Sequence, residues 1–362
     1  MTQDLRDKYL SIHDFLPDAK AAMSPEGWDY VTGGTETETT VARNRAALDA
    51  IALRPRILVD VSDIDSTADF LGKPCRLPVC LAPVGGLEVC HEDGALAVAQ
   101  AAGQFGVPTM MSSVSKRTKT EVRGATDNSA IFQLYVRGGD RFIENHVEEA
   151  LAEGFDAFAL TVDVAVYSRR ERDLVHRFDK PWRKDVDAEA IRAQAALSWA
   201  DVARVKTYDV PLIVKGIMTV EDARIAVDHG VDVIYVSNHG GRQLDHGLGA
   251  MDVLPEIVEA VGNQARIMVD GGFCRGSDIV KAVALGAHSI GLGRLYCYGL
   301  GAAGPAGVVR LLEILEDEVR SALGLTGVTS FADLTPEHVH LGAPLITRPH
   351  VHSAFPLVDW KA

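Results

Sequence analysis

Short apolar runs alternate with helix-patterned segments from Pro78 onward. Each run is continuously apolar, which is typical of parallel strands that are covered on both faces. The pattern occurs eight times, and eight strand–helix alternations favour a closed (β/α)₈ TIM barrel over an open doubly wound sheet. The expected strands are residues 78–84, 107–113, 130–136, 157–163, 210–216, 231–237, 265–271 and 289–293.

Five of the helix-patterned segments are followed directly by glycine, the residue that helix C-termini favour. We therefore expect each of these helices to end at its glycine. The expected helices and their glycines are 93–105 with Gly106, 141–153 with Gly154, 220–229 with Gly230, 251–261 with Gly262, and 277–285 with Gly286.

Three segments lie outside this alternation. Residues 1–77 show only short helical patterns, so we expect a helical extension and an irregular strap packed on a barrel at 78–330. Residues 169–201, between the fourth and fifth strands, are polar and lack a strand pattern. We expect a loop or lid there, because long loops in compact domains are often functional. Residues 331–362 are expected to form a C-terminal tail.

The composition is that of an ordinary globular protein. The chain has 362 residues, 47% hydrophobic and 24% charged, which is enough to bury a large core. A formal net charge of −14, without long Lys/Arg runs, argues against a partner that is a nucleic acid or an anionic membrane. An anionic substrate remains open, because a few arginines in a cleft override the global charge locally.

Targeting signals and the spacing of the cysteines indicate the cellular location and the state of the thiols. Residues 1–20 lack the apolar centre of a signal peptide, no run is long enough to span a bilayer, and the chain ends Asp-Trp-Lys-Ala rather than Ser-Lys-Leu. We therefore expect a cytoplasmic location. The five cysteines are odd in number and never form Cys-x-x-Cys, which predicts reduced thiols and no structural metal site.

Polar residues follow every expected strand after the first. In a TIM barrel these strand ends meet at one face, where active sites lie. One such residue usually caps a helix or satisfies a loop, but the repetition predicts a shared site whose buried polar groups bind a cofactor. The residues are Ser112, Ser113, Gln133, Tyr135, Thr161, Asp163, Lys215, Ser237, His239, Arg242, Asp270, Gly271, Gly272, Gly293 and Arg294.

Two glycine-containing turns on consecutive strands, 270–272 and 293–294, match the usual phosphate site of a barrel. Each alone is more often a tight turn, but together they favour a phosphate-bearing cofactor. Lys215 follows a buried run, so its ammonium group needs solvent or an anion. A Schiff base is the competing role for Lys215, and the glycine turns favour a cofactor anion.

His239 and Arg242 are three residues apart directly after a strand. A histidine accepts a proton near neutral pH, and a guanidinium group holds a carboxylate with two hydrogen bonds. With Asp163 to stabilise the imidazolium, this pattern predicts proton removal from a carboxylate-bearing substrate. Without the other strand-end residues, a surface His–Arg pair would be the commoner interpretation.

The string Ser-Asn-His-Gly-Gly-Arg-Gln-Leu-Asp at 237–245 resembles the FMN-dependent 2-hydroxy acid oxidases and dehydrogenases, the group with glycolate oxidase, lactate oxidase and mandelate dehydrogenase. Gln-Leu-Tyr at 133–135, Leu-Thr-Val-Asp at 160–163 and Val-Lys-Gly at 214–216 extend the resemblance, which covers residues 30–324. It implies FMN-dependent oxidation of an L-2-hydroxy acid to the 2-oxo acid, with oxygen or another electron acceptor, in a homo-oligomer that is commonly a tetramer.

The resemblance also implies roles for individual residues. His239 is the base, Asp163 stabilises its charged form, Tyr135 lies near the substrate oxygen, and Lys215 stabilises the anionic reduced flavin. The implied carboxylate-binding residues are Tyr30, Arg170 and Arg242. The implied FMN-binding residues are Ser112, Gln133, Thr161 and Ser237 for the ring and ribityl groups, Pro83, Val84 and Gly85 along the flavin face, and Asp270, Gly271, Gly272, Gly293 and Arg294 for ribityl and phosphate.

Three departures from the family pattern alter these expectations. Cys274 stands where the family has a phosphate-binding arginine, so we expect Arg275 to supply that contact. Gly85 and Val114 replace larger residues and leave room for a bulky side chain, such as the aromatic ring of mandelate. Ser168 replaces a glycine before the two arginines, which predicts a different path for the loop that carries Arg170.

Other functions remain open at this stage. The rivals are an FMN- or phosphate-binding barrel isomerase, a lyase that forms a Schiff base through Lys215, and a non-catalytic barrel that serves as a binding module. The His239/Arg242 string disfavours the first two. The charged residues retained at the strand ends disfavour the third.

Overall fold

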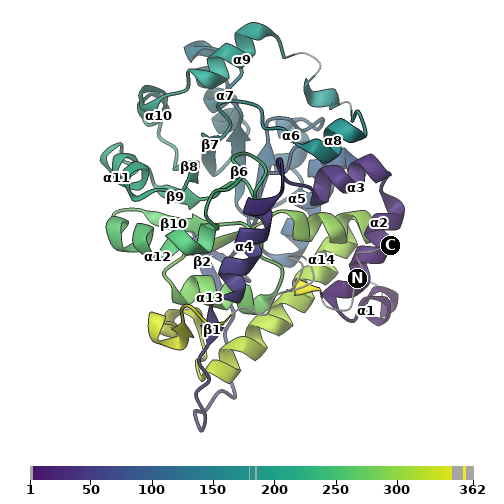
Figure 1. Cartoon of the computed structure of the whole chain (residues 1–362), viewed down its shortest axis with the longest axis vertical. Helices are drawn as coiled ribbons and strands as arrows, with labels where there is room; N and C mark the ends of the chain where they lie inside the picture. Colours follow the sequence, from purple (N-terminus) through teal and green to yellow (C-terminus); the bar gives the residue numbers. More distant parts are fainter. Residues whose placement is uncertain (1–2, 179, 184–185, 345–353, 356–362) are drawn as a thin grey trace.

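The computed structural model describes residues 3–178, 180–183, 186–344 and 354–355. Eight parallel strands close into a barrel, each paired with its neighbours in chain order (Figure 1). The predicted TIM barrel is therefore confirmed, and β8 alone runs one residue past its expected end. The strands are β4 Val79–Leu81, β5 Thr109–Ser112, β6 Ala130–Leu134, β7 Ala157–Thr161, β8 Leu212–Ile217, β9 Val233–Val236, β10 Arg266–Val269 and β11 Ser289–Leu292.

Apolar side chains cover both faces of these strands. One face of each strand points into the barrel interior, and the other packs against the surrounding helices. Because successive side chains point to opposite faces, a strand that is buried on both faces has to be apolar throughout. The interior cluster includes Cys80, Met110, Ile131, Ala157, Ala159, Ile213, Val233, Tyr235 and Met268.

The helices around the barrel agree closely with the sequence pattern. All five expected helices are present within two residues of their expected bounds, and the five glycines that follow them all have positive φ. The barrel helices are α5 Gly94–Phe105, α6 Lys119–Arg123, α7 Asp140–Ala152, α10 Trp199–Val205, α11 Val220–Asp228, α12 Ala250–Val261, α13 Gly276–Ala284, and α14 Arg294–Thr326, which has a break at Ala303 and Gly304.

An antiparallel hairpin of β2 (Ala68–Phe70) and β3 (Lys73–Cys75) closes one end of the barrel. Its Phe70 and Cys75 side chains join the interior cluster. Lys73 forms an ion pair with Asp156, just before β7. The hairpin therefore lies at the N-terminal ends of the strands, and the opposite mouth is the face where barrel active sites lie.

The N-terminal segment packs on the barrel as a set of short helices. Helix α2 lies against α14, and α4 lies against α12. Ser24 caps α3 by accepting a hydrogen bond from the Gly27 amide, and Pro25 fills the first turn. The elements are α1 Gln3–Lys8, η1 Ile12–Asp14, α2 Phe15–Ala22, α3 Pro25–Thr32, α4 Thr39–Asp49 and β1 Ala52–Leu53, and the short helix η2 Leu87–Val89 follows the first barrel strand.

The 169–201 segment differs from the expected loop, because much of it is helical. It contains α8 Glu171–Val175, η3 Pro181–Arg183, α9 Ala188–Ala195 and the start of α10. These helices are short and mostly exposed. They therefore lack the row of apolar residues at helical spacing by which an amphipathic helix is recognised in a sequence. Helix α8 lies beside α3 (Figure 1).

The described part of the tail returns to the N-terminal segment. It contains η4 Phe331–Asp333, η5 Pro336–His338 and β12 Val339–His340, which pairs with β1. Phe355 is buried against Tyr298 and His13.

All five cysteines are free thiols. No described helix is long and apolar enough to cross a membrane. The described residues contain no group of three metal-binding side chains.

Candidate active site

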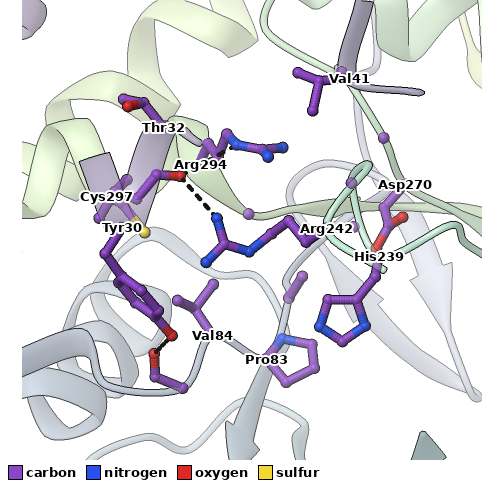
Figure 2. A pocket seen from close by; sticks show the side chains of 18 of the residues that line it. Tyr30, Thr32, Val41, Pro83, Val84, His239, Arg242, Asp270, Arg294 and Cys297 are labelled. Atoms are coloured by element: carbon purple, nitrogen blue, oxygen red, sulfur yellow. Dashed lines mark hydrogen bonds between the residues drawn. The ribbon is translucent and has the colours of Figure 1, made fainter. Parts of the chain in front are cut away.

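A pocket opens at the C-terminal ends of the barrel strands (Figure 2). Its empty volume is about 1590 Å³, which includes open solvent at the mouth. Most of the residues that the sequence predicted for the site line this pocket. They are Tyr30, Pro83, Val84, Gly85, Val114, Tyr135, Arg170, Lys215, His239, Arg242, Asp270, Gly271, Gly272, Gly293 and Arg294.

The remaining predicted residues, Arg275 apart, lie at the strand ends next to that lining. Ser112 Oγ accepts a hydrogen bond from the Val114 amide, and Gln133 Nε2 donates to Thr161 Oγ1. Asp163 and Ser237 contact lining residues, as described below. The barrel therefore brings together residues from seven different strand ends, as the sequence pattern predicted.

His239 lies between an acid and a phenol. Its Nδ1 is 3.0 Å from Asp163 Oδ1, and its Nε2 is 3.2 Å from the hydroxyl oxygen of Tyr135. All three side chains come from different strands or their loops, so the barrel itself fixes the arrangement. Nε2 is the nitrogen that faces the pocket, and it is available to exchange a proton there.

Burial and neighbouring charge set the protonation states of this group. Burial lowers the pKa of His239 below its ordinary value of 6.5, although the Asp163 charge acts in the opposite direction. For Asp163, burial opposes ionisation, but the His239 and Lys215 charges outweigh it and hold the pKa of the carboxyl group below its usual value. At neutral pH the site holds a neutral imidazole beside a carboxylate, which is the state that can accept a proton.

The turn that carries His239 requires unusual backbone angles. His239, Gly240 and Gly241 all have positive φ. A side chain at Gly241 would also overlap the backbone nitrogen of Val41, so glycine is needed there for space as well as for conformation. The Gly241 carbonyl accepts a hydrogen bond from the Thr35 amide, which ties this turn to the N-terminal segment.

Arg242 extends from this turn towards the end of helix α3 (Figure 2). Its guanidinium carbon lies 4.9 Å from the centre of the Tyr30 ring, and Nη1 donates to the Gly33 carbonyl at 2.8 Å. Tyr30 in turn donates its hydroxyl hydrogen to the Gly85 carbonyl at 2.7 Å. The ring therefore connects the N-terminal segment, Arg242 and the first barrel strand.

Arg170 joins the same cluster despite the Ser168 departure. Its Nε donates to the Arg242 carbonyl at 3.4 Å. Burial and the nearby Arg242 charge lower the pKa of Arg170 to about 10. Two partly buried guanidinium groups that repel each other gain stability when an anion binds between them.

Lys215 is held by a hydroxyl group and an acid. Its Nζ donates to Ser237 Oγ at 2.8 Å and lies 3.6 Å from Asp270 Oδ2, and the residue is only 4% exposed. Among the described residues, Gln133 Oε1 and Asp270 Oδ1 are buried acceptors without a hydrogen-bond partner. Ring and ribityl donors of a flavin would satisfy such acceptors, so this end of the pocket fits FMN.

The glycine turns and Arg294, where the sequence predicts the phosphate group, line another part of the pocket. A side chain at Gly293 would meet open space. Arg294 donates to the carbonyls of Val31 and Gly33. Cys274 lines the same pocket, but burial raises the pKa of its thiol to about 12, so it is neutral and contributes no cation.

Arg275 does not line this pocket, contrary to the expectation that it replaces the missing phosphate contact. Its Nη2 forms an ion pair with Glu318 at 2.6 Å, and the residue borders a separate groove. It stands at the N-cap of α13, where the chain turns away from the pocket mouth. Arg45 of α4 also lines the pocket, where it donates to Gly272 O and pairs with Asp278.

Gly85 and Val114 leave less room than the sequence suggested. A methyl group at Gly85 would overlap Cγ2 of Val114, so the valine already fills the space that the glycine leaves open. The two positions act as one packing unit. The room beside the substrate therefore depends on both residues together.

Several pocket residues were not found by sequence reasoning. They come from the loop after β6, from the 169–201 segment and from the tail, where no periodicity marks a side chain as inward-facing. Only their charge or aromatic character was available as a signal. They are Arg137, Tyr167, Arg183, Gln194, Ala354 and Phe355, together with Arg45.

Comparison with known proteins gives consistent results. The model of the FMN-dependent dehydrogenase family matches residues 19–341. Glycolate oxidase 1 of Zea mays is 37% identical over 350 residues (91% of this chain, 95% of that protein), and L-lactate oxidase of Nostoc sp. is 36% identical over 358 residues (92% and 98%). The crystal structure of a mandelate oxidase with (S)-2-phenylpropionate superimposes with a TM-score of 0.85 at 37% identity, covering 93% of this chain and 100% of that one.

Proposed function

Because this chain belongs to the family of FMN-dependent 2-hydroxy acid oxidases and dehydrogenases, it oxidises 2-hydroxy acids with FMN, and we propose that its own substrate is an L-2-hydroxy acid with a bulky side chain. The product is the 2-oxo acid, and oxygen or another acceptor takes the electrons. The observation that carries the proposal is the His239 imidazole, held by Asp163 on one side and open on the other to a pocket that Arg170 and Arg242 also line.

The proposed base is Nε2 of His239. It accepts the proton that the substrate loses, whether from the hydroxyl group or from the α-carbon. Asp163 remains ionised and stabilises the resulting imidazolium, because its carboxylate lies 3.0 Å from Nδ1. Tyr135 holds its own proton, since burial raises the pKa of its phenol, and donates a hydrogen bond at the substrate oxygen.

The proposed carboxylate site consists of Arg242, Arg170 and Tyr30. The two guanidinium groups supply the charge, and the Tyr30 ring under Arg242 limits where that group can move. Holding the carboxylate here orients the α-carbon towards His239. Such positioning is a large part of the catalytic advantage of any enzyme site.

FMN, when bound, accepts the two electrons of the oxidation. Lys215, Ser237, Gln133, Thr161 and Ser112 would hold its ring and ribityl groups, and Pro83 to Gly85 would lie along its face. Asp270, Gly271, Gly272, Gly293 and Arg294 would hold the ribityl and phosphate groups. The ammonium group of Lys215 is the buried cation that offsets negative charge on the reduced cofactor.

The side chain of the substrate is proposed to be larger than that of glycolate, with the aromatic ring of mandelate as the first case to test. The mandelate oxidase whose structure holds (S)-2-phenylpropionate supports this. A cytoplasmic location and a tetramer are proposals too, to be checked by cell fractionation and by light scattering of the purified protein.

The rival functions make different predictions. A Schiff-base lyase needs a free Lys215 amine, whereas Lys215 is bonded to Ser237 and lies near Asp270. Borohydride trapping of a substrate on Lys215 would favour that lyase. An isomerase would convert its substrate without any change in flavin absorbance, and a binding module would bind ligands without turnover.

The direct test is anaerobic bleaching of the flavin by a panel of 2-hydroxy acids, followed by reoxidation with oxygen or a quinone. We expect bleaching by the L-enantiomers. His239→Ala should stay yellow but lose bleaching, and Arg242→Ala should chiefly raise the substrate Kd. An active His239→Ala enzyme, or strong preference for glycolate over mandelate, would overturn the corresponding part of the proposal.

A further inference from the structure

Arginines gather at the substrate end of the pocket in greater number than one carboxylate needs. Arg170 and Arg242 suffice for the carboxylate that every 2-hydroxy acid carries. Two more line the same pocket, Arg137 in the loop after β6 and Arg183 in η3. A chain with a formal net charge of −14 has therefore concentrated positive charge in one place.

Two described acids near this cluster, Asp163 and Asp173, are already paired. Asp163 is bonded to His239, and Asp173 forms an ion pair with Lys180 at 2.5 Å. In the part of the chain that the structure describes, no ion pair involves Arg183. Burial lowers the pKa of Arg183, which is the effect of holding a guanidinium group away from water. An anion in the pocket would offset that cost.

A buried hydroxyl group stands beside Arg183. The guanidinium carbon of Arg183 lies 4.0 Å from the centre of the Tyr167 ring, so the ring positions the cation. The Tyr167 hydroxyl is buried and has no hydrogen-bond partner among the described residues. Both residues line the same pocket as Val114 and Tyr135. A buried donor without a partner is costly, and a ligand oxygen would satisfy it.

We propose that the side chain of the substrate carries a second carboxylate, which binds to the guanidinium group of Arg183 and the hydroxyl group of Tyr167. The substrate class is then the L-2-hydroxy dicarboxylic acids. This inference rests on the proposed function, because it takes the first carboxylate to be held by Arg170 and Arg242. Arg183 and Tyr167 become residues that determine specificity within the same site.

The experiment compares substrates of equal length with and without the second carboxylate. (S)-2-Hydroxypentanedioate is matched with (S)-2-hydroxypentanoate, and (S)-malate with (S)-2-hydroxybutanoate, with mandelate as the aromatic reference. Anaerobic stopped-flow bleaching of the holoenzyme gives the Kd and the reduction rate for each acid. A charged hydrogen bond in a partly buried site corresponds to about 10- to 100-fold in affinity, so at least one diacid should bind that much more tightly than its partner.

Variants of single residues test which side chains cause the preference for a diacid over a monoacid. Arg183→Gln should lower the ratio of diacid to monoacid affinity by about tenfold or more, and Tyr167→Phe should lower it by a smaller factor. Arg183→Lys keeps the charge and should retain part of the preference. Arg192→Gln removes an exposed arginine of α9, outside the pocket, and should leave the ratio unchanged.

The outcomes separate this inference from the proposed function. Bleaching by mandelate or the monoacids with no preference for a diacid overturns the second-carboxylate site and leaves the proposed function standing. Equal losses for both members of a pair in Arg183→Gln also overturn it, since they indicate that Arg183 only braces the 169–201 segment. If no 2-hydroxy acid bleaches the flavin, the proposed function itself fails.

Discussion

Oδ1 of Asp163 lies 3.0 Å from Nδ1 of His239. An asparagine at position 163 keeps the shape but cannot stabilise an imidazolium. We expect Asp163→Asn to lower kcat by about 100- to 10,000-fold, the range for loss of effective acid–base catalysis, while FMN stays bound. Steady-state kinetics and the flavin spectrum test this. An enzyme within fivefold of the wild-type kcat would contradict the assigned role.

The depressed pKa of His239 sets the acid limb of the pH profile. A base has to be neutral to accept a proton, so kcat/KM falls as the pH drops through its pKa. Since burial lowers the pKa of His239 below 6.5, we expect the fall to be centred below pH 6.5. Asp163 raises this pKa, so the residual activity of Asp163→Asn should show its acid limb at still lower pH. An acid limb centred above pH 6.5 in the wild-type enzyme would contradict the assignment.

The contact between positions 85 and 114 predicts strong coupling. Gly85→Ala would overlap Val114 Cγ2, and overpacking of this kind typically costs about 1–3 kcal/mol. Val114→Ala removes the overlapping atom, so the double variant should recover most of that loss. A double-mutant cycle on the free energy of unfolding measures the coupling. Additive effects of the two changes would show that the residues do not share this space.

Arg294 and Arg275 make opposite predictions for FMN affinity. Arg294 lines the pocket at the proposed phosphate site, whereas Arg275 is paired with Glu318 outside the pocket. Arg294→Met should weaken FMN binding by about 10- to 100-fold, and Arg275→Met should change it by less than about twofold. Titration of the apoprotein with FMN, followed by flavin fluorescence, gives both values. The reverse order would restore Arg275 as the phosphate ligand.

The ion pair of Arg45 and Asp278 predicts a large stability effect. Both side chains are buried, and Asp278 also accepts hydrogen bonds from the amides of Cys274 and Arg275. Removing one charge of a buried pair costs about 3–5 kcal/mol, so Asp278→Asn should lower the free energy of unfolding by about that amount. Asp49→Asn removes the partly exposed partner of the same arginine and should cost below about 1 kcal/mol. Urea denaturation compares them.

The barrel was predictable because strands that are buried on both faces consist mainly of apolar residues. Strands such as 130–134 and 157–161 are fully buried and apolar except for Gln133 and Thr161 near their ends, and the residues that follow them converge at one mouth of the barrel. The predictions for His239, Asp163 and Lys215 needed only their positions after strands. Their meeting in one pocket follows from the closure of the barrel.

The errors fall where local sequence does not determine direction. Arg275 is one residue from Cys274, yet the start of α13 turns it out of the pocket. The helices of the 169–201 segment were missed because short exposed helices have no stripe of buried apolar residues. Arg183 lies in this segment, and its guanidinium group packs on the ring of Tyr167. These placements depend on tertiary contacts, which the periodicity of apolar residues along the sequence does not predict.

The carbonyl of Gly33 accepts hydrogen bonds from both Arg242 and Arg294, at 2.8 Å each. One arginine belongs to the proposed substrate site and the other to the proposed phosphate site, yet both are anchored by the residue that follows α3. The N-terminal helices therefore help to position two arginines of the proposed site. In a chimera that joins this barrel to the N-terminal helices of a relative, Arg242 and Arg294 would have to bind a carbonyl group from a different protein. The two parts therefore have to be exchanged together.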